Sequence, residues 1–543
     1  MGVEYVHVTT GDGDDLYLTE HGLPFAAQLM PDCFWADEAW SRSNRERLDG
    51  TSVVYRIRTK PAGGRSRDIV LKWNRMGQDV PGATGGEDLL TAEFNSPFEE
   101  FALTGELRDA TGSSPGRLHT YKPLAIYVPA KLMDWDRLGR KQYKIEARQR
   151  AHPDMPLHLR RNYAVIYEWI KGIDAARACR EGRLTADEVD TLVARVERDL
   201  RQRGFVVRDN KPHHVIVRPG PDALVTGREG QILYAYVDFE LLERTPQREQ
   251  EIRAAKRRAY LVKQAHRFED RAVFPPHLRP VKILGVDYVY GRTESTNGAL
   301  WVVGKDPELF DYFLPEKWRK TPRTKISLAN QVYETTTKDN IRLVWRVSKV
   351  GEQPDMDPFK EDERRILDYG YNSPFEEIAL SMLLNACGLG AIYPRAIYMT
   401  GDGASIRAGM FDDRRYIRHA QIRTPDGQPI LREGHDYIII WGYWNGPDEL
   451  LAVKDDPPYT SINALRAYQE GLLDEPTYMQ LMERAKQRLA KAGIEDLNLR
   501  GNHLLLSLES SGRLAPGDDG LPAVLIRNFE LLRQIPEPAA GEG

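Results

Sequence analysis

Alternating apolar and polar residues predict two paired strands in the first part of the chain. The segments 52–60 and 68–73 both have this two-residue period, and a turn-rich stretch separates them. Apolar residues at helical spacing predict a helix over 184–204, with Thr185 as its cap. Further strands are expected at 124–128, 163–170, 214–219 and 232–239, and further helices from 96 onward and over 247–268. This order is typical of an α+β fold and not of alternating βαβ units.

The same succession of segments occurs twice along the chain. NSPFEEFAL at 95–103 returns as NSPFEEIAL at 372–380. Three other pairs keep the same order: 2–6 with 285–289, 163–174 with 437–448, and 236–242 with 526–532. Since the order is kept while the loop lengths change, the sequence predicts a tandem duplication. Its two homologous domains are expected at 1–275 and 276–543.

Composition and charge restrict the class of protein. The 543 residues include 76 Lys and Arg against 80 Asp and Glu, and 41% are hydrophobic, which is typical of a soluble globular chain. Because the basic and acidic residues nearly balance, we do not expect a nucleic-acid partner. We find no apolar run of about 20 residues, no leader pattern and no metal or disulfide spacing among the three cysteines. We therefore expect a cytoplasmic protein that does not enter a membrane.

The segment GFVVRDNKPHHVIV at 204–217 resembles the catalytic loop of protein kinases. Asp209 and Lys211 fall in register with the aspartate and lysine of that loop. Val207 stands where the family has a histidine, and His214 stands where it has an asparagine. The chain therefore resembles the protein-kinase-like superfamily, with two departures inside the motif itself.

Three further segments resemble motifs of the same family and follow in its order. YVDFEL resembles the metal-binding Asp-Phe-Gly motif, with Asp238 as its aspartate and Glu240 in place of its glycine. Upstream, VLKW puts Lys72 on a strand, and NSPFEEFAL resembles the helix whose glutamate pairs with that lysine. Glu99 is preferred to Glu100 for this pairing, because Ala and Leu follow it three and four positions later, as in the family pattern.

The resemblance extends to the hinge and implies a fold. YEWIKG resembles the hinge strand of ordinary kinases, which assigns Glu168 and Ile170 to nucleotide binding. The resemblance covers about 52–242 and, more weakly, 331–532. It implies two tandem bilobal α+β domains, each with an antiparallel-sheet N-lobe and a reduced helical C-lobe.

Phosphoryl transfer depends on positioning and on neutralising phosphate charge, which gives these residues their implied roles. Lys72, held by the helix glutamate, would bind the α and β phosphates of ATP, and Lys211 would stabilise the γ-phosphate. Asp209 would orient the acceptor hydroxyl, and Asp238 would hold Mg²⁺ with substrate phosphates. His214 either packs in its loop or binds metal, in which case Mn²⁺ would suit the imidazole better than Mg²⁺.

The second copy keeps the apolar framework but differs at the charged positions. Arg346 stands for Lys72 and Arg500 for Lys211, whereas Asn498 and Asn528 replace the two aspartates. An amide cannot accept a proton or neutralise a cation as a carboxylate does. The second copy therefore resembles a pseudokinase, a non-catalytic regulatory or structural domain through which a protein partner could bind.

Other features limit the kind of kinase that this chain could be. No GxGxxG occurs between the first strands, and the glycine-rich 82–88 follows the lysine strand, as a flexible loop would. The residues after Asp238 leave no room for the usual activation segment. The basic run at 137–161 is interpreted mainly as a solvated linker helix, with an anionic partner as the alternative. These features favour a compact, atypical kinase with a small-molecule, RNA-associated or unusual protein substrate.

Three functions remain open from the sequence. The first is ATP-dependent phosphoryl transfer by the first copy, with the second copy in support. The second keeps ATP binding but transfers AMP. The third is a non-catalytic scaffold or subunit, which the missing glycine loop and the substitutions Val207, His214 and Glu240 favour.

Overall fold

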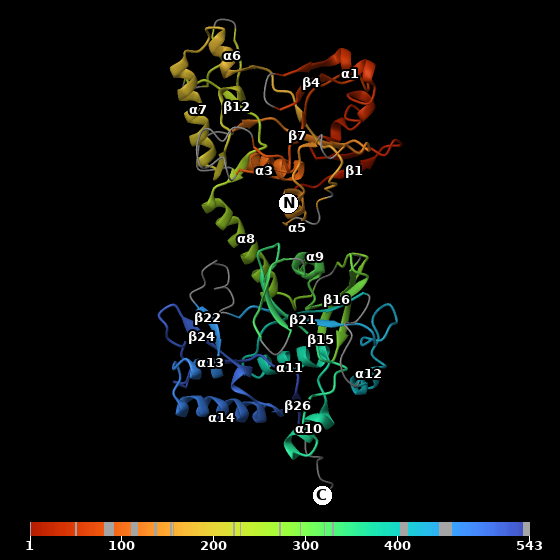
Figure 1. Ribbon diagram of the computed structural model, residues 1–543, viewed down its shortest axis with the longest axis vertical. Coiled ribbons are helices and arrows are strands. Elements are labelled where there is room, and N and C mark those ends of the chain that lie inside the picture. The colour runs from red at the N-terminus through yellow and green to blue at the C-terminus, as the bar shows by residue number, and fades with distance from the viewer. Residues whose placement is uncertain are drawn as a thin grey trace. The chain divides into compact units, whose positions relative to one another are not determined.

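The fold was analysed in a computed structural model, and it comprises two compact units (Figure 1). The units are Met1–Gln250 and Glu251–Gly543. The helix α8 (Pro246–Ala265) begins in the first unit, and its Tyr260 and Leu261 pack in a core of the second, ahead of the boundary expected at 275. The structure describes residues 2–48, 52–80, 92–109, 118–134, 138–151, 155, 157–220, 223–227, 230–270, 273–293, 295–319, 321–327, 331–401, 411–444, 459–517 and 519–535.

A seven-stranded antiparallel sheet forms the first part of unit one. In spatial order its strands are β1 (Val6–Thr9), β2 (Asp15–Leu18), β7 (Pro123–Val128), β8 (Ala164–Glu168), β5 (Asp68–Trp73), β4 (Val54–Arg58) and β3 (Arg45–Arg47). The strands predicted at 52–60 and 68–73 are the paired β4 and β5. Helix α3 (Pro97–Asp109) packs on the sheet through Phe98 and Phe101, which share an apolar core with β7 and β8.

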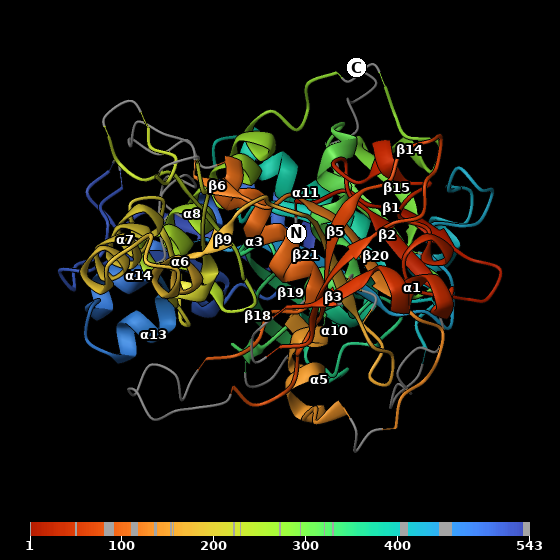
Figure 2. The ribbon, with the colours of Figure 1, turned by 90° about the horizontal axis from the view of Figure 1, so that it is seen from above.

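Helices and short strands make up the rest of unit one, and among them α6 (Ala175–Arg180) and α7 (Ala186–Arg201) lie to one side of this sheet in both Figure 1 and Figure 2. α7 (Ala186–Arg201) buries Val189, Leu192 and Val196, and a capping box with Thr185 begins it, so the helix predicted over 184–204 is confirmed. The smaller sheets are β6 (His119–Thr120), β12 (Tyr234–Tyr236), β11 (Val215–Val217) and β9 (Ile173–Asp174), and β10 (Phe205–Val207) with β13 (Leu242–Arg244). The other described elements are η1 (Leu23–Phe25), η2 (Pro31–Cys33), α1 (Glu38–Asn44), α5 (Gln142–Ala151), α6 (Ala175–Arg180) and η3 (Pro212–His214).

Unit two contains an eight-stranded antiparallel sheet. In spatial order its strands are β14 (Leu278–Ile283), β15 (Val286–Thr293), β16 (Gly298–Val303), β20 (Pro394–Met399), β21 (Tyr437–Gly442), β19 (Arg342–Val347), β18 (Val332–Thr336) and β17 (Arg323–Lys325). Smaller sheets are β22 (Tyr459–Asn463), β24 (Leu504–Glu509) and β25 (Val524–Ile526), and β23 (Ile494–Asp496) with β26 (Leu532–Gln534). The helices are η4 (Pro307–Phe313), α9 (Pro315–Trp318), α10 (Glu361–Tyr369), α11 (Pro374–Ala386), α12 (Arg414–Arg418), α13 (Ala464–Gln469), α14 (Glu475–Lys491) and η6 (Gly501–His503).

The two main sheets have the same local design around the lysine or arginine strand. In unit one the order β7-β8-β5-β4-β3 places β5 between β8 and β4, and in unit two β19 lies between β21 and β18 in the order β20-β21-β19-β18-β17. α3 and α11 both begin at the repeated NSPFEE segment, where a serine and a glutamate cap the helix reciprocally. The chain is thus a mixed α+β protein with antiparallel sheets. The glycine-rich 82–88 lies outside the described residues.

Candidate functional site

Lys72 forms the centre of a buried cluster of charged residues in unit one. It lies on β5 with only 4% of its surface exposed, and it pairs with Asp238 and with Glu240, at an Nζ–Oε2 distance of 2.9 Å to the latter. Burial alone would lower the pKa of Lys72, but the carboxylates of Asp238, Glu240 and Glu100 outweigh it and raise that pKa well above its usual value. Lys72 is therefore a fixed cation at the inner face of the sheet.

Asp238 is held in an unusual backbone conformation beside Lys72. Its φ is 75°, in the left-handed region that non-glycine residues occupy at a cost of about 1–2 kcal/mol. Its N–H donates to the hydroxyl of buried Tyr121 at 2.9 Å, which helps to hold this geometry. Burial would raise the pKa of the Asp238 carboxyl, but Lys72 and then His214 outweigh it and hold that pKa below its usual range.

The two glutamates at the start of α3 have different surroundings. Glu99, which the sequence pattern favoured as the partner of Lys72, accepts the N–H of Ser96 at 2.8 Å and pairs with Arg148 of α5. Glu100 is fully buried, accepts the Tyr167 hydroxyl at 2.7 Å and acts electrostatically on Lys72. The helix glutamate nearest in role to the expected one is thus Glu100, because it lies on the face of α3 that packs against the sheet.

Asp209 and Lys211 lie together in the loop between β10 and β11. Lys211 Nζ is 2.7 Å from Asp209 Oδ1, and both side chains are partly exposed. Asp209, Asp238 and Lys72 all act on the buried hydroxyl of Tyr236, in β12. Burial first, and then the two aspartates, raise the pKa of Tyr236, with Lys72 opposing them. The loop of Asp209 and the segment of Asp238 therefore lie close enough for both aspartates to act on the hydroxyl of Tyr236.

His214 contacts the same aspartate, and its surroundings bear on a metal site. Its Nε2 is 3.3 Å from Asp238 Oδ2, and its buried Nδ1 has no hydrogen-bond partner among the described residues. In the described part of the chain, no group of three or more His, Cys, Asp or Glu side chains is placed to hold a metal ion. Asp238 and His214 thus offer one carboxylate and one imidazole at this place.

The two predicted hinge residues lie away from the charged cluster of Lys72. Glu168 ends β8, and its carboxylate faces Arg67 at 3.8 Å and Lys122 at 3.6 Å. Its N–H donates to the carbonyl of Lys122 at 3.0 Å. Ile170 is half-buried against the core that contains α3 and α7. The strand ends at Glu168, whose side chain takes part in a partly exposed ion-pair network.

Three residues of the site were not expected from the sequence. Glu240, the residue in the glycine position, is 3% exposed and pairs with both Lys72 and Arg75. The ring of Tyr121 packs tilted against that of Tyr167, with centroids 3.8 Å apart, and its hydroxyl accepts the backbone N–H of Asp238. Arg75 stands two residues after β5, and its counterpart by strand register, Lys349, pairs with Glu530 in unit two. That repeated basic position was the available signal for Arg75.

Unit two preserves the buried cation and its acidic partners. Arg346 on β19 pairs with Glu377 of α11 and, at 3.0 Å, with Glu530. Asn528 donates from Nδ2 to His503 Nε2 at 3.1 Å. His503 in turn faces Asp496 across 3.3 Å through Nδ1. The position of the first unit's Asp238 is therefore occupied by an amide bound to a histidine.

Comparisons with known proteins add little to this picture. No protein-family description matches the chain, and no curated protein does. Among solved structures, the chain is similar to WaaP in complex with acyl carrier protein, with 16% identity, a TM-score of 0.21 and coverage of 39% of this chain and 68% of that one. A complex of WbdD with a kinase inhibitor gives 13% identity, a TM-score of 0.18 and 41% coverage of each chain. Rv3197 from Mycobacterium tuberculosis, bound to erythromycin, gives 18% identity, a TM-score of 0.17 and coverage of 47% and 65%.

At TM-scores of 0.17 to 0.21, these likenesses establish neither the fold nor the activity of this chain. Within the described part of the chain, each helix is too short or too polar to cross a bilayer.

Proposed function

We propose that unit one is an ATP-dependent phosphotransferase of the protein-kinase-like superfamily. One observation carries this proposal: three segments far apart in sequence bring Lys72, Glu100 and Asp238 into one buried cluster, beside the loop of Asp209. A fixed cation can bind phosphate oxygens directly, and an ionised carboxylate beside it can hold the divalent cation that binds the same phosphates. The acceptor is proposed to be a small molecule or a protein, and the enzyme is proposed to act in the cytoplasm.

Each group in the cluster has a distinct proposed role. Lys72 would bind the α and β phosphates, which would replace Asp238 as its partner. Glu100 and Glu240 would keep Lys72 in place, since both act on its charge. Asp209 would orient the acceptor hydroxyl. Lys211, whose Nζ is 2.7 Å from Asp209, would stabilise the negative charge that develops on the γ-phosphate. Glu168 and Ile170 are proposed to border the adenine.

The residues present fit a divalent cation that is shared with the nucleotide. Mg²⁺ commonly uses one or two carboxylates together with phosphate oxygens, and Asp238 would supply that carboxylate. His214, with Nε2 at 3.3 Å from Asp238, would add a nitrogen ligand and so favour Mn²⁺. The cation would supply neutralisation of phosphate charge.

Unit two is proposed to be a homologous copy that has lost this chemistry. Its buried Arg346–Glu377 and Arg346–Glu530 pairs repeat the framework of unit one. Asn498 and Asn528 stand where unit one has Asp209 and Asp238, so neither carboxylate function is present. Because unit two keeps the framework but lacks both aspartates, we assign it a supporting or regulatory role. This role includes contact with a protein partner.

A thermal-shift titration of the full chain with ATP and Mg²⁺ or Mn²⁺ tests the assignment. A nucleotide that binds only the folded state raises the midpoint of unfolding as its concentration increases. We expect the part of the shift that depends on the divalent cation to be lost in Lys72→Met and Asp238→Ala and kept in Lys131→Met, a matched change at an exposed lysine. No shift at millimolar ATP in the unsubstituted chain would overturn the proposal. Transfer of γ-labelled rather than α-labelled phosphate then separates a kinase from an AMP transferase.

A non-catalytic scaffold is the second candidate, and one contact favours it. Lys72 already pairs with Asp238, the carboxylate that a cation would need. A permanent pair would close the site to nucleotide and leave a purely structural cluster. In that case ATP would produce no shift in any variant, with either metal.

A further inference from the structure

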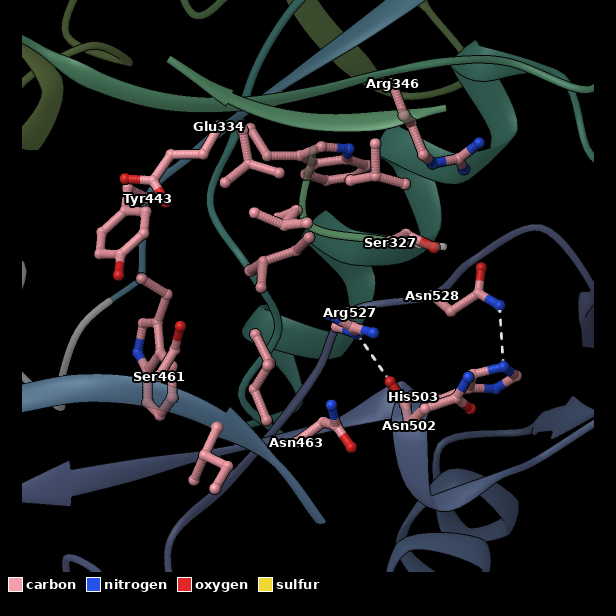
Figure 3. A pocket seen from close by; sticks show the side chains of 18 of the residues that line it. Ser327, Glu334, Arg346, Tyr443, Ser461, Asn463, Asn502, His503, Arg527 and Asn528 are labelled. Carbon is pink, nitrogen blue, oxygen red and sulfur yellow. Dashed lines mark hydrogen bonds between the residues drawn. The ribbon is translucent and has the colours of Figure 1, made fainter. Parts of the chain in front are cut away.

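A cavity of about 320 Å³ lies in unit two, between its main sheet and the strands β22 and β24 (Figure 3). This volume is at the lower end of the range of pockets that hold small molecules. Apolar side chains line it on two sides: Val332 and Val344 from the sheet, and Ile462 and Leu505 from the smaller strands. Trp441 of β21 adds an aromatic surface. Such a slot suits a flat ring.

The polar end of the cavity carries a guanidinium with no ion-pair partner in the part of the chain that the structure describes. Arg527 donates from Nε to the carbonyl of Asn502 at 2.6 Å, and Figure 3 shows this contact at the centre of the pocket. Burial lowers the pKa of Arg527. Arg527 is half-buried and lines the cavity, where its guanidinium can pair with an anion.

The other charges on the pocket wall are already balanced. Glu334 accepts from Arg342 at 3.0 Å, Glu530 pairs with Arg346 and Lys349, and Arg466 pairs with Glu470 at 2.6 Å. Arg527 is therefore the lining charge that a ligand would have to match.

Unit one has the opposite distribution of charge at these positions. Val237 stands where unit two has Arg527, and Asp238 stands where it has Asn528. Because Asn528 is an amide, this position offers no carboxylate for a cation. Its nitrogen donates a hydrogen bond to His503. Unit two has thus exchanged a cation-binding group for an anion-binding one at adjacent residues.

The apolar end also differs between the units. At the position of Ile392, which lines the cavity, unit one has the larger Tyr121, which is fully packed against Tyr167. The smaller side chain leaves room for a ring next to Trp441.

We infer that this cavity binds a nucleoside phosphate without a divalent cation. The ring would lie in the apolar slot, and the phosphate would pair with Arg527, whose charge takes the place of the metal. The inference concerns unit two alone and does not depend on the activity proposed for unit one.

Calorimetric titration of the full chain with ADP in excess EDTA tests this inference. Excess EDTA withholds the divalent cation that the site proposed in unit one shares with its nucleotide, and Arg527→Val locates the remaining binding in unit two. We expect saturable binding that Mg²⁺ does not strengthen, and a loss of at least about tenfold in affinity in Arg527→Val, which installs the residue of unit one. Arg513→Val, the same change at an exposed arginine of unit two, should leave the affinity unaltered.

Two further variants keep the test decisive if Arg527→Val unfolds. Ile392→Tyr should fill the ring slot and abolish binding. Asn528→Asp should weaken binding in EDTA and make it depend on Mg²⁺, because it restores a carboxylate beside the phosphate. Absence of saturable ADP binding in EDTA, or equal affinity in folded Arg527→Val and Arg513→Val, would overturn the inference. Phosphate transfer by unit one is measured separately, with Mg²⁺ present.

Discussion

Lys72 and Glu240 form a buried ion pair in unit one, with 2.9 Å between Nζ and Oε2. The same pair occurs in unit two as Arg346 and Glu530, at 3.0 Å. Glu240 stands where the resemblance to kinases leads one to expect glycine. Since both units use this glutamate to hold a cation on the sheet, it belongs to the framework of the fold and does not by itself mark a lost activity.

We predict that Lys72→Met strongly destabilises unit one. The change leaves the Asp238 carboxylate without its lysine and leaves Glu240 with Arg75 alone, and loss of one partner of a buried pair costs about 3–5 kcal/mol. Lys72→Arg should cost much less, because unit two accommodates Arg346 at the same position. Urea unfolding of the full chain measures the difference. Equal unfolding midpoints for Lys72→Met and the unsubstituted protein would contradict this account of the cluster.

A second prediction concerns pH and the neighbouring glutamates of α3. Burial raises the pKa of Glu100 to about 7, from an ordinary carboxyl value of 4.5, although Lys72 and Tyr167 oppose it. Between these values the folded chain binds more protons than the unfolded chain, so this group makes stability fall as the pH rises. Glu100→Gln should reduce the fall between pH 5 and pH 8 by on the order of 2 kcal/mol.

Glu99→Gln provides the matched control, one residue away. Glu99 caps α3 and pairs with Arg148, so its substitution should lower stability while Glu100 keeps its pH dependence. Urea unfolding at several pH values gives both quantities. The explanation fails if the two variants show the same dependence on pH.

These two residues also show what the sequence could and could not predict. The start of the helix, its serine cap and the strand of Lys72 follow from local patterns, and the structure has them. Adjacent residues of a helix point in directions about 100° apart, so the choice between Glu99 and Glu100 depends on how α3 packs on the sheet. The contacts of Tyr121 and Glu240 join residues far apart in sequence, and no local pattern contains them.

We predict that Asp209→Asn separates binding from catalysis. Asp209 is partly exposed and pairs with Lys211, so the variant should stay folded and still show the ATP-dependent thermal shift. Transfer of γ-phosphate should fall about 10²–10⁴-fold, the range for loss of a general base. Asn498→Asp in unit two is the control and should restore no activity in this variant. Residual transfer above a tenth of the normal rate would rule out the role assigned to Asp209.

The hydroxyl of Tyr121 should control the geometry of Asp238 and thereby the use of metal. It accepts the N–H of Asp238, a non-glycine residue held at a φ of 75°. Tyr121→Phe leaves that N–H without its acceptor, at a cost of about 1–3 kcal/mol, and frees the carboxylate to turn. We therefore expect that Tyr121→Phe needs a several-fold higher concentration of Mg²⁺ or Mn²⁺ for half-maximal phosphate transfer. The fall in kcat at saturating metal should be smaller than this change.

Tyr127→Phe is the control. It removes a hydrogen bond to Asp14 in the same unit and should lower stability without changing the metal dependence. If both variants had the same metal requirement as the unsubstituted chain, Tyr121 would be a packing residue only, and the conformation of Asp238 would have to be held by its pairing with Lys72.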